Sequence, residues 1–333
     1  MRTLVIGAGA IGAFLAARFA LSGQRVGLYG RGAGMAVLAR DGIRLVRHGD
    51  EASGAVVARP TCYAEVPPVD GWDLVVFAVK AQDLPAAARQ FSEHVKHAVV
   101  LLPQNGLAWW HFLPGMEAGP LRLQSVDPDG WAEQALPLDR IAGCVVSKGL
   151  MFTGPGELRE AVVPGDQFCV GDVLPGSGAA GRAEGCLRQA GLPTLLSDDI
   201  REEKWRKLMV NVAFNPLGAL SRLGFGQIVD IGQGRRLVAQ LIDEAVAVGR
   251  AYGMRSDISL DAIFARAESS RHHKTSMLQD VEAGKRLEIA PILGSLLELA
   301  GHRGMAVPGL QVVHDCLCLV EHGLQMRRGE GGS

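Results

Sequence analysis

The chain has 333 residues, and its 34 Lys and Arg nearly balance 35 Asp and Glu, for a formal net charge of −1. This balance, with no basic stripe, argues against nucleic-acid or membrane-surface partners, and no run of about 18 apolar residues predicts a membrane span. A hydrophobic content of 48% excludes disorder, and the 43 glycines follow no collagen-like repeat. The six cysteines lack zinc-ligand spacing, so we expect reduced thiols, no metal site and a cytoplasmic location.

The first half of the chain alternates short apolar runs with helical patterns. Strands are predicted at residues 3–6, 25–29, 74–79, 98–102 and 141–146. This alternation predicts a parallel sheet with right-handed crossovers. Residues 43–46 and 54–58 predict an inserted hairpin, and the glycine-rich stretch 165–191 predicts short antiparallel strands.

The first apolar run leads directly into a glycine-rich turn. This turn fits the pattern G-x-G-x-x-G between a strand and a helix, with Gly7, Ala8, Gly9, Ala10, Ile11 and Gly12. The first glycine permits the tight turn, the second lets the backbone approach a pyrophosphate, and the third allows close packing of the helix on the strand. The N-terminus of the helix then offers N–H groups to phosphates. The pattern predicts a dinucleotide site, with a purely structural turn as the alternative.

Polar residues follow three of the predicted strands. The second strand ends in Tyr29-Gly30-Arg31, without the acidic residue that binds the ribose 2′-hydroxyl of NAD. Arg31 can pair with a 2′-phosphate, which favours NADPH, unless it is a solvated turn residue. Lys80 and Asn105 follow the next two strands, where ligands bind in open α/β sheets, although Asn-Gly is also a common turn.

The second half of the chain is dominated by helical patterns. The most informative one carries Lys207, Asn211 and Asn215 at positions i, i+4 and i+8, on one face and among apolar residues. Buried Lys and Asn side chains need partners, and a desolvated lysine can donate a proton near neutral pH. The alternative is a solvated polar stripe. The predicted helices cover residues 201–220, 234–252, 260–267, 276–282, 291–300 and 311–322.

A second polar cluster lies further along the chain. Ser276 opens the stretch Ser-Met-Leu-Gln-Asp, and Glu288 follows a short basic turn and precedes a helix. A serine hydroxyl can bind a substrate carboxylate. On spacing alone, however, a helix N-cap or a turn residue is the better interpretation of Ser276.

Together these motifs resemble the 2-dehydropantoate 2-reductase (ketopantoate reductase) family from residue 1 to about residue 308. The combination of the Lys-x3-Asn-x3-Asn-Pro helix with Ser-Met-Leu-Gln-Asp and a later Glu is specific to that family. The resemblance implies an α/β Rossmann-type parallel sheet domain, here residues 1–198. It also implies an all-α domain like that of 6-phosphogluconate dehydrogenase, here residues 199–326, before a disordered tail at 327–333.

The resemblance also implies an activity, the NADPH-dependent reduction of ketopantoate to pantoate for pantothenate and coenzyme A synthesis. Lys207 then corresponds to the proton donor, and Asn211, Asn215 and Ser276 correspond to substrate ligands. Lys80, Asn105 and Glu288 correspond to residues near the nicotinamide and its ribose, and Gly149 to a backbone contact with the cofactor. A small 2-keto acid is the expected partner. The sequence does not define the oligomeric state, and a homodimer is one candidate assembly.

Three stretches differ from the family pattern. Gly224-Phe225-Gly226 stands where the family has an Asn-Gly turn, and residues 290–294 are apolar where the family is polar. Residues 107–131 are longer and contain three tryptophans, which could cover a bulkier substrate or pack on the helical domain or a partner. The alternative function is therefore reduction of a different, bulkier 2-keto acid. Two rivals come from other classes. Lys207 with its asparagines argues against a non-catalytic NADP(H) sensor, and the complete G-x-G-x-x-G, Arg31 and the polar helix argue against a methyltransferase.

Overall fold

The computed structural model describes residues 1–47, 54–112, 121–161, 165–255 and 257–330. They form two compact units, which are described separately. The first unit comprises Met1–Gln104 and Asp129–Glu203, and the second comprises Asn105–Pro128 and Lys204–Ser333. Within the described ranges, no helix is long and apolar enough to cross a membrane.

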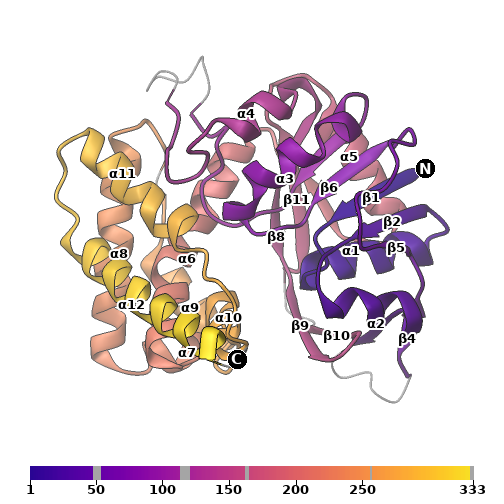
Figure 1. Cartoon of the computed structure of the whole chain (residues 1–333). Helices are drawn as coiled ribbons and strands as arrows, with labels where there is room; N and C mark the ends of the chain where they lie inside the picture. Colours follow the sequence, from indigo (N-terminus) through magenta and orange to yellow (C-terminus); the bar gives the residue numbers. More distant parts are fainter. Residues whose placement is uncertain (48–53, 113–120, 162–164, 256, 331–333) are drawn as a thin grey trace. The chain divides into compact units, whose positions relative to one another are not determined.

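The first unit is built on a mostly parallel sheet (Figure 1). Its central strands β1 and β6 are buried on both faces, which explains their continuous apolar sequences. The antiparallel pair in this sheet is β8 with β11. In the described residues the spatial order is β12 (Thr194–Leu196), β11 (Gln167–Asp172), β8 (Ile141–Ser147), β7 (Val99–Leu102), β6 (Leu74–Phe77), β1 (Arg2–Ile6), β2 (Arg25–Tyr29) and β5 (Thr61–Tyr63).

The order β5-β2-β1-β6-β7-β8 is the doubly wound order of dinucleotide-binding domains, which confirms the predicted Rossmann-type sheet. The register sets Ile6 of β1 between Tyr29 of β2 and Phe77 of β6. The carboxyl ends of these three strands therefore meet at one edge. The helical segments of this unit are α1 (Ala10–Leu21), α2 (Ala33–Asp41), α3 (Leu84–Gln90), α4 (Trp131–Ala135) and α5 (Ala179–Gln189), with short 3-10 turns at Ala81–Asp83, Ser92–Val95 and Leu138–Arg140.

A second, four-stranded sheet in the described residues has the order β4-β3-β10-β9. The predicted hairpin is confirmed as the antiparallel pair β3–β4, whose connection includes residues outside the described ranges. β10 adds to β3 in parallel and to β9 antiparallel. The strands are β3 (Ile43–Arg47), β4 (Val56–Ala58), β9 (Gly149–Gly154) and β10 (Glu157–Ala161).

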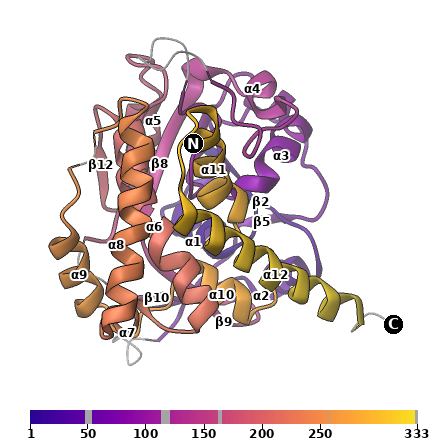
Figure 2. The same cartoon turned by 90° about the vertical axis from the view of Figure 1, so that its left-hand side faces the viewer.

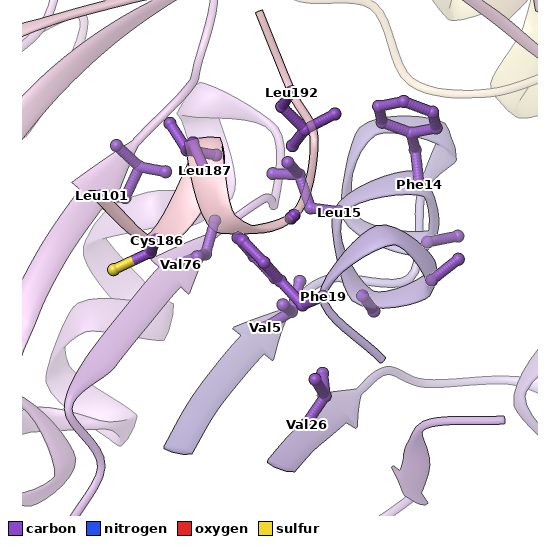
Figure 3. Packing of buried hydrophobic residues seen from close by; sticks show 14 of the residues in the cluster. Val5, Phe14, Leu15, Phe19, Val26, Val76, Leu101, Cys186, Leu187 and Leu192 are labelled. Carbon is purple, nitrogen blue, oxygen red and sulfur yellow. The ribbon is translucent and has the colours of Figure 1, made fainter. Parts of the chain in front are cut away.

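The stretch 165–191 differs from its prediction. It forms one strand, β11, followed by the helix α5 instead of several short strands. The helix is stable despite two internal glycines because Ala183, Cys186 and Leu187 pack into the core. Figure 3 shows Leu187 in the same apolar cluster as Leu15 of α1 and Val76 of β6. Tertiary packing here outweighs the low helix propensity of glycine.

The second unit is helical in the described residues. α6 is one long helix despite Pro216, and Phe225–Val229 forms the short helix α7, which the periodicity did not predict. α12 continues to Glu330, so residues 327–330 of the predicted tail are helical, while 331–333 lie outside the described residues. The helices are α6 (Ile200–Ser221), α7, α8 (Gly232–Arg250), α9 (Leu260–Ser269), α10 (Ser276–Glu282), the π-helix η5 (Ala290–Gly294), α11 (Ser295–His302) and α12 (Pro308–Glu330).

The segment 105–128 belongs to this helical unit although it follows a strand of the sheet. Glu298 of α11 holds it, accepting hydrogen bonds from the Gln124 N–H at 2.7 Å and from the Ser125 N–H at 2.9 Å. The Ser125 hydroxyl adds a third hydrogen bond of 2.6 Å. One carboxylate therefore satisfies two backbone donors and one side chain of the segment.

Candidate active site

The glycine-rich turn connects β1 to α1 as predicted. Gly7 has a φ of +108°, and a Cβ there would lie 2.8 Å from the backbone of Ala78, which only glycine tolerates. A Cβ on Gly12 would overlap the carbonyl oxygen of Gly7. By contrast, a Cβ on Gly9 would meet no atom within 4 Å. Packing therefore explains why positions 7 and 12 require glycine. It does not explain glycine at position 9, where the open space could hold a ligand.

The end of β2 lies against this turn. The Gly7 N–H donates to the carbonyl of Tyr29 at 2.8 Å, and a Cβ on Gly30 would lie 2.7 Å from the Cβ of Ala8. Arg31 follows with an exposed side chain, and no acidic group pairs with it among the described residues. This arrangement fits a dinucleotide whose pyrophosphate lies at the N-terminus of α1 and whose adenosine ribose lies near Arg31.

Two further predicted cofactor residues lie in the first unit. Lys80 comes two residues after Ala78, the neighbour of Gly7, so it follows β6 at the edge that carries the turn. Gly149 is the first residue of β9 and pairs with Ala161 of β10. The preceding residue, Lys148, is buried in an ion cluster with Glu160 and Asp166, and its ammonium lies 5.7 Å from the ring of Phe14 in α1. No motif or spacing in the sequence predicted this cluster.

The polar face of α6 has the predicted helical spacing. Lys207 and Asn211 are half-buried, and Asn215 is 3% exposed. The Nδ2 group of Asn215 is buried without a hydrogen-bond partner among the described residues. An unpartnered buried amide is unfavourable by about 1–3 kcal/mol, so Asn215 is suited to a ligand rather than to the fold.

Ser276 opens α10, and the N-cap of this helix is the neighbouring Thr275. The Thr275 hydroxyl accepts from the Leu278 N–H at 3.1 Å, whereas Ser276 is exposed at the first helical position. The N-cap interpretation of Ser276 is therefore wrong, and its hydroxyl is not used for capping. α10 begins close to α6, because a Cβ on Gly218 would lie 3.0 Å from the Thr275 hydroxyl oxygen. Gly218 is three residues after Asn215, so Ser276 lies near the end of the polar face.

Asn105 and Glu288, separated by 183 residues, come together in the second unit. The Asn105 amide nitrogen lies 3.5 Å from a carboxylate oxygen of Glu288. Gly106 has a φ of +76°, and a Cβ there would collide with the carbonyl oxygen of Pro291, to which the Leu107 N–H donates at 2.9 Å. The π-helix η5 thus fixes the Asn105 loop. π-helical turns occur often at functional sites.

Packing explains the sequences of residues 224–226 and 290–294, the two stretches that are apolar where the family pattern is polar. Gly224 is the N-cap of α7, and a Cβ there would lie 2.8 Å from the carbonyl oxygen of Arg271. Pro291, Ile292 and Leu293 are buried where η5 meets the Asn105 loop. Neither stretch offers a polar side chain that could bind a substrate.

The three tryptophans of the 107–131 stretch separate into the two units. Trp109 and Trp110 are buried in the helical unit, and the ammonium of the buried Lys204 lies 5.8 Å from the Trp110 ring. Trp131 opens α4 in the first unit, with the Arg89 guanidinium 4.5 Å above its ring. Packing on the helical domain is therefore the correct alternative for Trp109 and Trp110. Lys204, three residues before Lys207, was not identified from the sequence.

No group of three or more His, Cys, Asp or Glu side chains that could hold a metal ion occurs among the residues that the structure describes. The doubly wound sheet and its glycine turn define the first unit as a Rossmann-type dinucleotide-binding domain. The polar helix face in the second unit is the feature that separates this chain from other proteins with such a domain.

Comparison with known proteins identifies the family. The ketopantoate reductase PanE/ApbA model matches residues 3–116, and the ketopantoate reductase PanE/ApbA C-terminal model matches residues 199–321. A 2-dehydropantoate 2-reductase from Mesorhizobium japonicum is 35% identical over 99% of both chains. The chain therefore belongs to the ketopantoate reductase PanE/ApbA family and is an oxidoreductase of that family.

Solved structures agree with this assignment. The PanE/ApbA family ketopantoate reductase from Ralstonia eutropha JMP134 is 27% identical, covers 98% of this chain and 100% of its own, and superposes with a TM-score of 0.80. The ternary structure of D-mandelate dehydrogenase with NADH and anilino(oxo)acetate has a TM-score of 0.82 at 21% identity, covering 98% of this chain and 100% of its own. The second likeness concerns the fold alone.

Proposed function

We propose that this protein reduces a 2-keto acid with NADPH, and that ketopantoate, which would give pantoate, is the first substrate to test. The observation that carries the proposal is the polar face of α6. Its buried Asn215 amide has no hydrogen-bond partner among the described residues, while Lys207 and Asn211 remain half-buried on the same face. A face of this kind suits a small polar ligand better than it suits a solvated stripe.

The first unit supplies the cofactor site in this proposal, with the division near residue 198 that the sequence predicts. The open space at Gly9 and the N-terminus of α1 fit a pyrophosphate, and Arg31 fits a 2′-phosphate. When bound, NADPH supplies the hydride. Lys80, Asn105, Gly149 and Glu288 are proposed to contact its nicotinamide half.

The second unit supplies the substrate groups. Lys207 would donate a hydrogen bond to the ketone oxygen, stabilise the negative charge that develops there, and deliver the proton. Asn211 and Asn215 would hold a hydroxyl or carboxylate of the substrate, and Ser276 would donate to its carboxylate. Because these groups are carried by two helices packed at Gly218, the substrate would be oriented before reaction.

The proposal also concerns which 2-keto acid is the substrate. The Mesorhizobium japonicum relative is named for 2-dehydropantoate, and the ternary D-mandelate dehydrogenase structure holds an aromatic oxoacetate. Trp109 and Trp110 are used in packing, which supports a small branched substrate over one covered by these tryptophans. A homodimer and a cytoplasmic location remain predictions.

A substrate screen tests the proposal directly. We expect NADPH oxidation with ketopantoate to have a kcat/KM at least tenfold above that with phenylglyoxylate or branched 2-keto acids lacking the hydroxyl group. The physical reason is that a site built to bind a hydroxyl rejects analogues that leave its polar groups unpaired. A preference for the aromatic acid would overturn the pantoate assignment, and no oxidation with any 2-keto acid would overturn the reductase itself.

Replacement of Arg31 by alanine tests the choice of cofactor. We expect the KM for NADPH to rise by roughly tenfold while the KM for NADH changes little, because a charge-assisted hydrogen bond contributes about 1.5–3 kcal/mol. Arg40→Ala is the matched control, since Arg40 lies in the same unit and pairs with Asp41. Equal effects on both cofactors would show that Arg31 does not read the 2′-phosphate.

A further inference from the structure

The π-helical turn η5 continues directly into α11, so the two form one continuous helical segment. η5 packs against α12, and α11 packs against α8 (Figure 2). Ser295, the first residue of α11, is completely buried. Glu288, proposed above to contact the nicotinamide half of NADPH, is buried two residues before the turn. The turn is therefore a firmly packed part of the helical unit that adjoins a proposed cofactor residue.

The carbonyl oxygen of Pro291 accepts two hydrogen bonds at this turn. One comes from the Leu107 N–H at 2.9 Å, and the other comes from the Ser295 hydroxyl at 2.9 Å. A serine hydroxyl that donates to the carbonyl four residues earlier competes with the backbone ladder and often bends a helix. A hydroxyl in this position can therefore hold the Pro291 carbonyl open to a donor from outside the helix.

The loop that meets this carbonyl carries Asn105. A Cβ on Gly106, the next residue, would lie 2.4 Å from the Pro291 carbonyl oxygen, so the loop approaches the turn more closely than a residue with a side chain could. The Asn105 amide nitrogen in turn lies 3.5 Å from a carboxylate oxygen of Glu288. One side of η5 thus supplies Glu288, while the Pro291 carbonyl holds the loop that brings Asn105 beside it.

The rest of the 105–128 segment is attached at a different place. Glu298, one turn after Ser295, accepts hydrogen bonds from the backbone N–H groups of Gln124 and Ser125. Loss of the Ser295 hydroxyl leaves this attachment in place, and the Leu107 N–H keeps its acceptor. We therefore expect a variant without the hydroxyl to fold, with a change confined to the orientation of one carbonyl.

We propose that Ser295 is a positioning residue of the cofactor site. Its hydroxyl orients the Pro291 carbonyl, and this carbonyl holds the loop that carries Asn105. The role rests on the proposed contact of Asn105 with the nicotinamide half of NADPH. Because Ser295 is buried and acts through the loop, its effect on NADPH binding must depend on the Asn105 side chain.

Fluorescence titration with NADPH in a double-mutant cycle tests this role. Ser295→Ala should raise the dissociation constant for NADPH roughly three- to tenfold, the range that one lost neutral hydrogen bond covers. Asn105→Ala should weaken binding by at least as much. In the Asn105→Ala background, Ser295→Ala should then add less than about twofold, because changes that act through one contact are not additive. Fully additive losses would overturn the proposal, since a general disturbance of the fold would not depend on Asn105.

Two further variants show whether the hydroxyl itself is responsible. Ser221→Ala removes the same kind of hydrogen bond, from a serine hydroxyl to the Leu217 carbonyl four residues earlier, and should leave NADPH binding unchanged. Ser295→Thr keeps the hydroxyl and should bind NADPH within about threefold of the wild type. Equal losses in the alanine and threonine variants of Ser295 would mean that packing matters rather than the hydroxyl, and would overturn the proposal.

Amide hydrogen exchange follows the loop without any ligand. Peptides that contain Leu107 should exchange faster in Ser295→Ala than in the wild type or Ser221→Ala, and unchanged exchange would overturn the proposed role of the hydroxyl. A wild-type chain that binds NADPH but reduces no 2-keto acid would overturn the proposed reductase and leave this role standing. If Asn105→Ala bound NADPH like the wild type, the role of Ser295 would fall and the reductase would stand.

Discussion

Replacing Lys207 by alanine is expected to lower kcat by a factor of roughly 10² or more, with a smaller change in KM. The lysine lies half-buried on the polar face of α6, one turn before Asn211. If its ammonium stabilises the charge on the reacting oxygen and delivers the proton, its loss affects the transition state more than substrate binding. Steady-state NADPH oxidation over a range of 2-keto acid concentrations measures both constants.

The pH profile makes this experiment specific to proton donation. A donor must be protonated, so activity of the wild-type enzyme should fall as pH rises through the pKa of Lys207, and this alkaline limb should disappear in the alanine variant. Arg206→Ala is the neighbouring control, because Arg206 is exposed on the same helix. Turnover like that of the wild type in Lys207→Ala would remove this residue from the mechanism, whereas an equal loss in Arg206→Ala would indicate a general disturbance of α6.

Much of the first unit could be predicted from the sequence because its signals are local. The strands predicted at residues 25–29 and 141–146 agree almost residue for residue with the observed β2 and β8. A strand that is buried on both faces has a nearly continuous apolar sequence, so it can be recognised from the sequence alone. The G-x-G-x-x-G turn is likewise defined by its neighbours in sequence. α5 was missed because its stability comes from packing on distant strands rather than from its own glycine-rich sequence.

Contacts between distant residues could not be predicted in this way. Asn105 and Glu288 meet where η5 accepts a hydrogen bond from Leu107, and no periodicity encodes that contact. The same holds for Trp110, which follows the sheet in sequence but has Lys204 of α6 over its ring. Thr275 and Ser276 have similar cap propensities, so only the observed hydrogen bond to Leu278 distinguishes the cap from the exposed hydroxyl.

The second large effect is expected at Gly9. Gly9→Ala should weaken NADPH binding by roughly ten- to a hundredfold, because a methyl group at the turn keeps a pyrophosphate from the backbone N–H groups, and hydrogen bonds to charged groups contribute about 1.5–3 kcal/mol each. The protein itself should tolerate the change. Gly9 has φ −69° and ψ −179°, which any residue adopts, and a Cβ there meets no atom within 4 Å. Fluorescence titration with NADPH and thermal unfolding measure the two quantities separately.

Two other glycines make this result decisive. Gly34→Ala in α2 also adds a methyl group in open space, so it should leave the affinity unchanged and should not lower stability, since alanine favours the helix more than glycine does. Gly12→Ala should instead destabilise the fold, because its Cβ overlaps the Gly7 carbonyl oxygen. If Gly9→Ala bound NADPH as tightly as the wild type, the turn would not be the pyrophosphate site. A melting temperature lowered as much as in Gly12→Ala would mean that Gly9 is required by the fold rather than by a ligand.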